Sequence, residues 1–339
     1  MIAVRDLNRY TDQYFVNSRR VCEAANQRTR VIYQVFQRGE VVLCGMRYVL
    51  DLLRSLGPGV EIYALDDGAQ VSAMETVMHL IGPVEQLFVY ETIYLGLLSR
   101  MTRVATNVRE AVNAANGKPM LFFPARFDIP EAQEYDGYAA RIGGAFGAST
   151  QAQADAFAKS AVGTMPHALI AAFQGDTVAA ALAFSEALPN EPLWALVDFD
   201  NDSARTSVEV FRALQERGRK LTGVRLDTSQ ELVDRSLAER GVESHGVQPE
   251  LVLEVRRQLD AAGGSEVKIS VSGGFSAEKI RIFEEKHAPV DVYAVGERFL
   301  RGSTPFTSDV VGYYEDGRFV ACAKVGREFR PNPRLVRVK

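Results

Sequence analysis

The sequence predicts an α/β protein in which a parallel sheet closes, or nearly closes, into a barrel. Between residues 118 and 301, short apolar runs alternate with amphipathic helical stretches, and parallel strands need crossovers that are usually helical. At least five such runs occur there, which fits one barrel better than two small domains. The residues on either side contain more segments with the pattern of extended strands, which indicates a second domain.

Before residue 118 the sequence mixes extended and helical candidates. Strands are predicted at 30–36 and 60–65, and helices at 47–55 and 91–114. In the last helix the apolar residues recur at helical spacing and form one apolar face. They are Ile93, Leu97, Leu98, Met101, Val104 and Ala105.

Within the barrel region, five strands are predicted at 120–123, 194–197, 223–226, 267–271 and 290–295. The intervening helices are predicted at 203–217, 229–240 and 276–285, with an earlier one ending near Arg141. Residues that favour N-caps precede three of these helices. They are Asp202–Ser203, Thr228–Ser229 and Ser276.

From Thr307 the chain becomes extended again, and residues 315–318 (EDGR) predict a hairpin turn. We expect this C-terminal piece to pack on the N-terminal domain. The predicted division is therefore an α/β domain of residues 1–117 with 302–339, and a barrel domain of residues 118–301.

Composition excludes several classes of protein. The 339 residues have 39 basic and 43 acidic side chains, and a net charge of −4 disfavours a nucleic-acid-binding protein. No stretch approaches the roughly 20 apolar residues of a membrane span, and residues 1–10 lack the apolar core of a signal peptide. The three widely spaced cysteines predict neither a disulfide framework nor a metal site. We expect a cytoplasmic enzyme.

The carboxyl ends of the predicted strands carry the reactive side chains, as they do in α/β barrels. Arg126 follows the first strand, Arg225 lies within the third, and Asp227 directly follows the third. The second strand is followed by a cluster of three carboxylates, Asp198, Asp200 and Asp202. These three could bind Mg²⁺ or ribose hydroxyls, but a solvated loop before a helix is the simpler interpretation.

Glycines follow the last two strands: Gly273 and Gly274 after one, and Gly296 after the other. Their backbone N–H groups could approach a phosphate, because the last two loops of such barrels form the usual phosphate site. The alternative is that they are ordinary turn glycines, and spacing leaves both interpretations open.

His167 opens a predicted helix within the segment GTMPHALI, residues 163–170. A helix N-terminus disfavours the imidazolium, so a neutral histidine there could act as a nucleophile or an acceptor. Taken alone, a buried histidine with satisfied hydrogen bonds is the simpler interpretation. The other three histidines have no neighbours at metal-ligand spacing.

Seven segments, in order, carry a resemblance to a known family: TDQY (11–14), FPAR (123–126), GAFGAST (144–150), GTMPHALI (163–170), GVRLD (223–227), SGG (272–274) with YAVG (293–296), and NPRL (332–335). The chain resembles the nicotinate phosphoribosyltransferase family, which is related to nicotinamide phosphoribosyltransferase. The resemblance extends from Thr11 to about Leu335. Each motif alone is weak, but seven in family order argue against coincidence.

The resemblance implies an irregular α/β (TIM-like) barrel plus an α/β domain formed by the N-terminal segment and the C-terminal tail. It implies transfer of phosphoribosyl from 5-phosphoribosyl 1-pyrophosphate to nicotinate, which yields nicotinate mononucleotide and pyrophosphate in NAD biosynthesis. Mg²⁺ would accompany the pyrophosphate substrate, and ATP hydrolysis would be coupled in some members. A homodimer with sites shared between subunits is also implied.

The resemblance also assigns roles to residues. The catalytic residues are His167, which is phosphorylated in ATP-coupled members, together with Arg225 and Asp227. The substrate-binding residues are Phe123 and Tyr14 of the partner subunit, which enclose the pyridine ring, and Arg126, Ser149, Thr150 and Asp198. The phosphate-binding residues are Ser272, Gly273, Gly274 and Gly296. No metal is expected to be held by the protein alone.

The sequence departs from the family at two places. Gln230 stands where the family has a carboxylate, and Glu297 places an anion beside the second phosphate loop. Nicotinamide is the nearest alternative substrate, but Arg126 suits an anion and Ser149 stands where an amide would need an acceptor. Quinolinate would need several clustered cations. A non-catalytic protein that binds nucleotides or pyridines is the alternative from another class.

Overall fold

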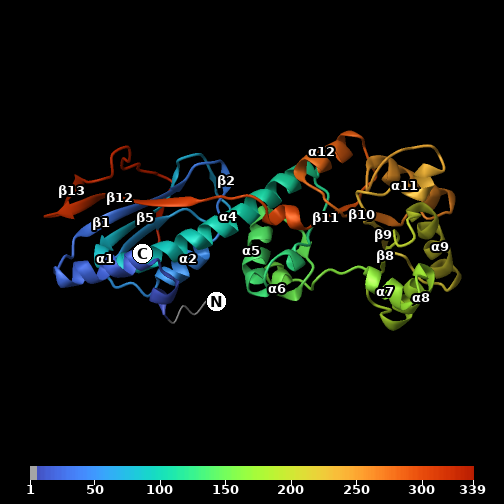
Figure 1. The fold of residues 1–339 in the computed structure, drawn as a ribbon, viewed down its shortest axis with the longest axis horizontal. Helices are drawn as coiled ribbons and strands as arrows, with labels where there is room; N and C mark the ends of the chain where they lie inside the picture. Colours follow the sequence, from blue (N-terminus) through green and yellow to red (C-terminus); the bar gives the residue numbers. More distant parts are fainter. Residues whose placement is uncertain (1–5) are drawn as a thin grey trace. The chain divides into compact units, whose positions relative to one another are not determined.

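The computed structural model describes residues 6–339. Residues 1–5 lie outside the described residues. They are part of the predicted domain 1–117 and of the segment 1–10 that was examined for a signal peptide. The chain divides into two compact units: residues up to Thr106 together with Arg301–Lys339, and Asn107–Leu300. Figure 1 shows the elements of both units in chain colours.

The first unit is built on a six-stranded sheet of order β13-β12-β1-β5-β3-β14. All pairs in it are antiparallel. Two C-terminal segments join it: β12 pairs with β1 in the interior of the sheet, and β14 pairs with β3 at one edge. The prediction that the C-terminal piece returns to the N-terminal sheet is therefore confirmed. The strands are β1 (Arg30–Gln37), β3 (Glu61–Ala64), β5 (Thr76–Pro83), β12 (Phe306–Glu315), β13 (Arg318–Ala321) and β14 (Val336–Arg337).

Helices and a short two-stranded sheet complete the first unit. The helices are α1 (Gln13–Ala24), α2 (Met46–Leu53), α3 (Val84–Leu87) and α4 (Glu91–Ala114), whose last turns belong to the second unit. The small sheet pairs β2 (Val41–Val42) with β4 (Gln70–Val71). One core joins the sheet, α2 and the first turns of α4, and its fully buried members include Val35, Leu53, Met78 and Leu98.

Glu91, the first residue of α4, is expected to make the stability of the fold depend on pH. Burial, followed by the charges of Asp309 and Asp12, raises the pKa of this carboxyl from 4.5 to about 8. The folded protein therefore keeps a proton that the unfolded chain has already lost, and stability should fall as pH rises from about 4.5 to about 8. Glu91→Gln removes this ionisation, so it should stabilise the fold by about 2 kcal/mol near pH 9 and change it little near pH 4.5.

Thermal unfolding measured across this pH range would test the prediction. Glu110→Gln is the matched control, because Glu110 is an exposed glutamate of the same helix. Its unfolding midpoints should follow those of the unaltered protein at every pH. A Glu91→Gln variant with the same pH profile as the unaltered protein would contradict the assignment.

The second unit contains a six-stranded sheet of order β7-β6-β11-β10-β9-β8, and every pair in it is parallel. The predicted parallel sheet is confirmed. Within residues 6–339 no ladder joins the edge strands β7 and β8, so the sheet curls into part of a barrel without closing. The strands are β6 (Met120–Phe122), β7 (Gly147–Ala148), β8 (Trp194–Leu196), β9 (Gly223–Leu226), β10 (Lys268–Val271) and β11 (Val292–Val295).

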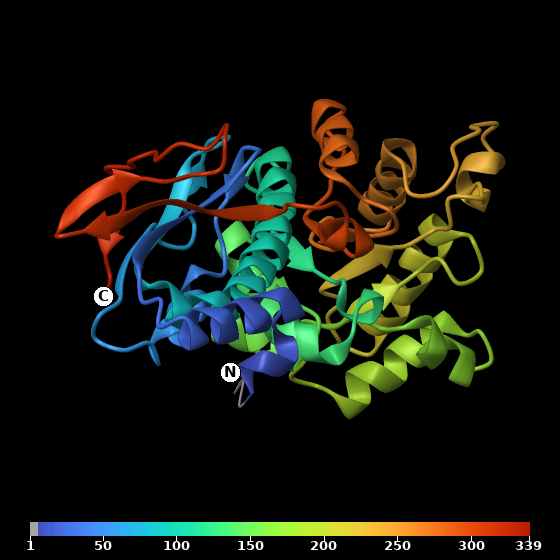
Figure 2. The ribbon, with the colours of Figure 1, turned by 60° about the vertical axis from the view of Figure 1, so that its left-hand side comes forward.

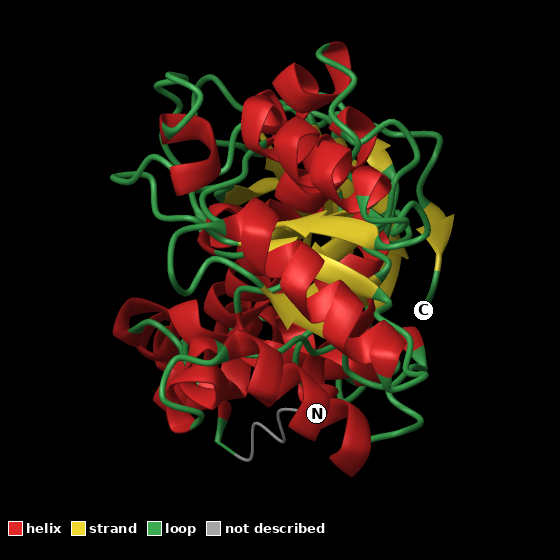
Figure 3. Ribbon diagram, turned by 90° about the vertical axis from the view of Figure 1, so that its right-hand side faces the viewer, coloured by secondary structure: helices red, strands yellow, loops and turns green. Residues whose placement is uncertain are grey.

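Helices connect these strands and cover the sheet (Figures 2 and 3). Two of the predicted N-caps are confirmed. The Asp202 side chain accepts a hydrogen bond from the Arg205 N–H at the start of α9, and the Ser276 side chain accepts one from the Lys279 N–H at the start of α12. The helices are α5 (Gln133–Gly143), α6 (Gln151–Ala154), α7 (His167–Ala172), α8 (Thr177–Ala187), α9 (Ser203–Glu216), α10 (Arg235–Ala238), α11 (Pro249–Ala261) and α12 (Ala277–Glu285).

The helix predicted at 229–240 is wrong, because only α10 forms there. The carboxylate of Asp234 is fully buried and accepts hydrogen bonds from the N–H groups of Ser203 and Ser236 and from the Ser236 hydroxyl. An aspartate that bonds locally in this way competes with a continuous helix. The sequence analysis also missed the helices α1, α8 and α11 and several strands, among them β5 and β7.

Two helical glycines allow a test of packing in the second and first units. A Cβ on Gly137 of α5 would overlap the backbone of Gln153 in α6, whereas one on Gly96 of α4 meets nothing within 4 Å. Gly137→Ala should therefore destabilise the protein by about 2–3 kcal/mol, because backbone must move. Gly96→Ala should stabilise it by about 0.5–1 kcal/mol through helix propensity. Urea denaturation of both variants checks the predicted difference in sign.

Candidate active site

The ends of β9 and β10 place three predicted site residues in one hydrogen-bonded group. The Arg225 guanidinium donates from Nη2 to Asp227 Oδ2 at 3.1 Å and from Nη1 to the Thr164 hydroxyl at 2.8 Å. The Ser272 hydroxyl donates to Asp227 Oδ1 at 2.7 Å. Asp227 is therefore held from both sides, with its carboxylate still partly exposed.

Arg225 also has a buried Nε–H with no partner among the described residues. The Thr228 hydroxyl, next to Asp227, is likewise buried and unpartnered. Buried donors without partners carry a free-energy cost, so each of these groups can gain a hydrogen bond from a molecule or water that enters the site.

His167 is the first residue of α7, as predicted, and its Nε2 lies 3.2 Å from both carboxylate oxygens of Asp198. The imidazole is about half exposed, whereas the Asp198 side chain is almost buried. Burial raises the pKa of Asp198, as does the nearby charge of Asp227, while His167 opposes this shift. Because the charge of Asp227 reaches Asp198, the His167–Asp198 pair and the Arg225–Asp227 group lie near one another.

The other carboxylates of the predicted acidic cluster have structural roles. Asp200 and Asp202 both pair with Arg205, and Asp202 caps α9. For these two residues the simpler interpretation, a loop before a helix N-terminus, is correct. Asp198 alone faces His167.

Gly273 and Gly274 have backbone φ angles of +87° and +69°, in a region that residues other than glycine rarely adopt. A Cβ on Gly273 would lie 3.3 Å from Asp227 Oδ1, and one on Gly274 would overlap the side-chain amide of Gln230. The turn after β10 is thus packed directly against Asp227 and Gln230. The sequence analysis noted Gln230 as a departure from the family but did not predict this contact.

Gly296 lies against the turn that carries Phe123 and Arg126. The Phe123 N–H donates to Val295 O at 2.8 Å, and a Cβ on Gly296 would come within 2.9 Å of the Phe127 ring. The Arg126 guanidinium is exposed and lies 5.3 Å from the centre of that ring. This places Arg126 at the same strand ends as the glycine turn.

Ser149 and Thr150 follow β7, the strand beside β6. The Ser149 N–H donates to Phe122 O at 3.2 Å, which fixes this residue next to Phe123. The Thr150 hydroxyl accepts a bond from the Gln153 N–H and donates to Gln133 Oε1 at 2.8 Å, so it acts as the N-cap of α6.

Tyr14 belongs to the first unit, on α1. It is 60% exposed, and its hydroxyl lies 3.3 Å from Asp12 Oδ2. An exposed tyrosine on a helix surface is available to a second protein chain.

Among the described residues, Thr164 is the side-chain partner of the Arg225 guanidinium that the sequence analysis did not single out, although it lies inside the GTMPHALI segment. Its position three residues before His167 could have indicated that it lies near the site. Within residues 6–339 no group of three or more His, Cys, Asp or Glu side chains could hold a metal ion. No described helix is long and apolar enough to cross a membrane.

Two family models match the chain. The N-terminal domain model of quinolinate phosphoribosyl transferase matches residues 12–102, and its C-terminal domain model matches residues 104–303. The chain therefore belongs to the quinolinate phosphoribosyl transferase family. This result confirms the family-level resemblance found in the sequence.

Relatives with named activities support the same family. Nicotinate phosphoribosyltransferase pncB2 of Mycobacterium tuberculosis is 27% identical over 71% of this chain and 48% of its own length. Nicotinate phosphoribosyltransferase of Bacillus subtilis is 25% identical over 78% of this chain and 51% of its own. The chain thus spans about half the length of these curated relatives.

Solved structures give the same fold. Nicotinate-nucleotide pyrophosphorylase from Pyrococcus furiosus is 32% identical, with a TM-score of 0.82, over 95% of this chain and 78% of that one. Human nicotinic acid phosphoribosyltransferase shares the fold at 17% identity, with a TM-score of 0.71, over 90% and 75% of the two chains.

Proposed function

We propose that this protein is a nicotinate phosphoribosyltransferase, which joins nicotinate to the ribose of 5-phosphoribosyl 1-pyrophosphate. The carrying observation is the Arg225–Asp227–Ser272 group, which holds a partly exposed carboxylate beside a glycine turn at the strand ends. A carboxylate suits ribose hydroxyls, and bare backbone beside it suits a phosphate. The named relatives support the choice of nicotinate.

In the proposed reaction, the ribose C1–oxygen bond to pyrophosphate breaks and a bond forms from C1 to the pyridine nitrogen. Positive charge develops on the ribose as pyrophosphate leaves, so catalysis depends on positioning and electrostatics. Asp227 would bind ribose hydroxyls. The turns at Gly273–Gly274 and Gly296 would receive the 5-phosphate, with the Arg225 guanidinium nearby.

Mg²⁺ fits the donor set, because this metal binds through one or two carboxylates together with substrate phosphates. Asp198 and Asp227 are the carboxylates that would hold it, and it would neutralise charge on the leaving pyrophosphate. Without a cation, the two negative charges oppose one another.

Nicotinate fits the cations of the site better than quinolinate does. Arg225 already pairs with Asp227 and Thr164, which leaves Arg126 as the exposed guanidinium beside Phe123. One guanidinium matches one carboxylate. We further propose that Phe123 stacks on the pyridine and that Tyr14 of the partner subunit covers its other face in a homodimer.

ATP coupling would use the pairing of His167 with Asp198. If the Nε2–H donates to Asp198, the lone pair stays on Nδ1. Nδ1 would then attack the γ-phosphorus of ATP, with ADP as the leaving group. The phosphohistidine would later lose its phosphoryl group to water.

Pyrophosphate release from purified protein tests the proposal. The reaction contains 5-phosphoribosyl 1-pyrophosphate and Mg²⁺ with nicotinate, nicotinamide or quinolinate, each with and without ATP. We expect release with nicotinate. Release with nicotinamide alone, or with quinolinate together with carbon dioxide, would reassign the substrate. No release with any base from folded protein would favour a non-catalytic binding protein.

A further inference from the structure

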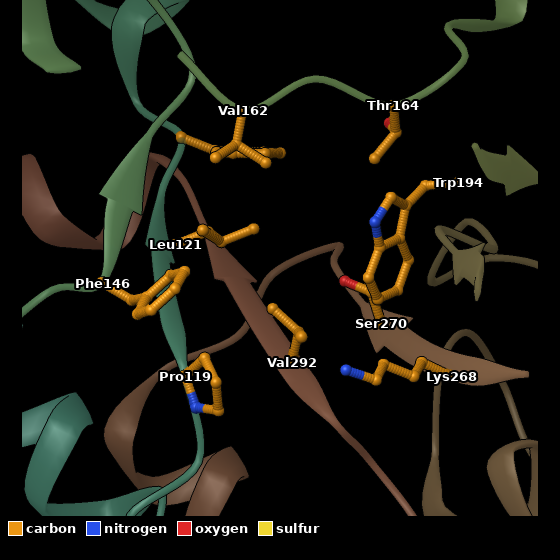
Figure 4. A pocket seen from close by; sticks show the side chains of 10 residues that line it. Pro119, Leu121, Phe146, Val162, Thr164, Trp194, Lys268, Ser270 and Val292 are labelled. Atoms are coloured by element: carbon orange, nitrogen blue, oxygen red, sulfur yellow. The ribbon is translucent and has the colours of Figure 1, made fainter. Parts of the chain in front are cut away.

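A cavity of about 210 Å³ lies on one face of the parallel sheet of the second unit. Alternate residues of β6 and its flanks, Pro119, Leu121 and Phe123, line it, as do Lys268 and Ser270 of β10. Alternate residues of a strand point to the same face, so the cavity is bounded by side chains from several strands. Figure 4 shows these side chains around the space.

Most of the lining is apolar, and Leu121, Phe146, Val162 and Val292 contribute to it. An apolar cavity of this size is large enough for a small organic molecule, since even a cavity of about 150 Å³ can stay dry and take up benzene. The space therefore suits an aromatic ring with a short chain attached.

Three polar groups border this apolar space without a partner from the chain. In residues 6–339 no hydrogen bond or ion pair is found for the Lys268 ammonium, the Ser270 hydroxyl or the Trp194 indole N–H. Figure 4 shows all three turned toward the space that Leu121 and Val292 face from the other side. An ammonium, a hydroxyl and an N–H together can donate to an anion.

The position of Trp194 follows from a glycine on the next strand. A Cβ on Gly223 would come within 2.6 Å of the indole ring and 2.8 Å of Lys268 O, so only glycine leaves room for the ring there. The indole therefore packs against Gly223 of β9 and lines the cavity.

Lys268 lines a second, open basin as well as the apolar cavity, and that basin contains carboxylates. Glu266 and Asp291 border a neighbouring open basin that Lys268 also lines, and Asp291 accepts a hydrogen bond from the Ile269 N–H. No carboxylate lines the apolar cavity itself. An anion in the cavity would thus meet the exposed Lys268 with no carboxylate in the cavity lining, while the carboxylates that could compete for the ammonium border the neighbouring basin.

We infer that this cavity binds a small amphiphilic carboxylate, with its aryl or alkyl part among the apolar side chains and its carboxylate at Lys268. The site adjoins the candidate active site, because Phe123 and Thr164 line the cavity and Thr164 also accepts a bond from Arg225. The inference does not depend on the proposed catalytic activity, since it concerns binding alone.

Trp194 is the sole tryptophan of the chain, so its fluorescence reports on this cavity. We would titrate the protein with 4-phenylbutyrate and with the uncharged 4-phenylbutanol, and follow binding by fluorescence and by calorimetry. Saturable binding of the carboxylate, tighter than that of the alcohol, is expected. Lys268→Met should weaken carboxylate binding about tenfold and leave alcohol binding unchanged.

Two further variants sharpen the test. Val292→Phe should abolish binding of both probes by filling the space, and Lys220→Met, an exposed lysine elsewhere, should change nothing. Circular dichroism would verify that each variant folds. The inference is overturned if neither probe binds, if the alcohol binds as tightly as the carboxylate, if Lys268→Met affects both probes equally, or if Val292→Phe still binds.

Discussion

Replacing Asp227 with asparagine is expected to lower kcat/KM for phosphoribosyl transfer about 10³-fold. The carboxylate accepts hydrogen bonds from Ser272 and Arg225, and it remains partly exposed to receive ribose hydroxyls. Asparagine preserves the shape of the side chain but removes its charge and gives one end to N–H donors. The NH₂ group of asparagine would then face the Arg225 or Ser272 donor, so one hydrogen bond is lost. The variant also lacks the negative charge that stabilises the positive charge developing on ribose.

Steady-state pyrophosphate release measures this effect. Asp200→Asn is the matched control, because Asp200 also follows a strand of the same sheet but pairs with Arg205 and Thr206. We expect it to change kcat/KM less than about threefold, as for a surface charge outside the site. Similar losses in both variants would show that Asp227 acts through the fold and not through the reacting ribose.

Arg126→Ala should have the second largest effect, and it should depend on the base. We expect kcat/KM for nicotinate to fall about 10²-fold, because the variant loses a guanidinium paired with the substrate carboxylate. Any turnover with nicotinamide should change much less, since the amide carries no charge. The expected result is therefore a change in the ratio of the two substrates.

Kinetics with both bases, at saturating 5-phosphoribosyl 1-pyrophosphate, would measure this ratio. Arg212→Ala, on α9 outside the site, serves as the control for loss of an arginine. Equal loss for nicotinate and nicotinamide would refute the assignment of Arg126 to the carboxylate. Unchanged nicotinate kinetics would place the pyridine elsewhere.

Local patterns in the sequence predicted much of the fold. The helix at Glu91–Ala114 and the strand at Gly223–Leu226 have the predicted bounds, and the hairpin turn lies where EDGR predicted it. These features depend on periodicity and turn chemistry over a few residues. The helix predicted at 229–240 is wrong because of Asp234. Its buried carboxylate accepts a hydrogen bond from the N–H of Ser203, which lies 31 residues earlier in the chain. No local pattern reports such a partner.

The candidate site shows the same limit. Strand ends identified Asp227, Arg225 and the glycine turns, because parallel strands bring their carboxyl ends to one edge. The pairing of His167 with Asp198, rather than with Asp200 or Asp202, depends on the segment before α7, where the Met165 N–H donates to Trp194 O of β8. The unpartnered groups of Trp194, Lys268 and Ser270 come from two strands, β8 and β10, and only the assembled sheet brings them together.

The pairing of β1 with β12 affects the order in which the chain folds during synthesis. Arg30 lies opposite Tyr314, so β1 can pair with β12 only after the ribosome has passed residue 314. The second unit, Asn107–Leu300, is continuous in sequence and emerges earlier. We expect the second unit to become protease-resistant first. Until β12 is synthesised, β1 has an unpaired edge to which other chains or chaperones can bind.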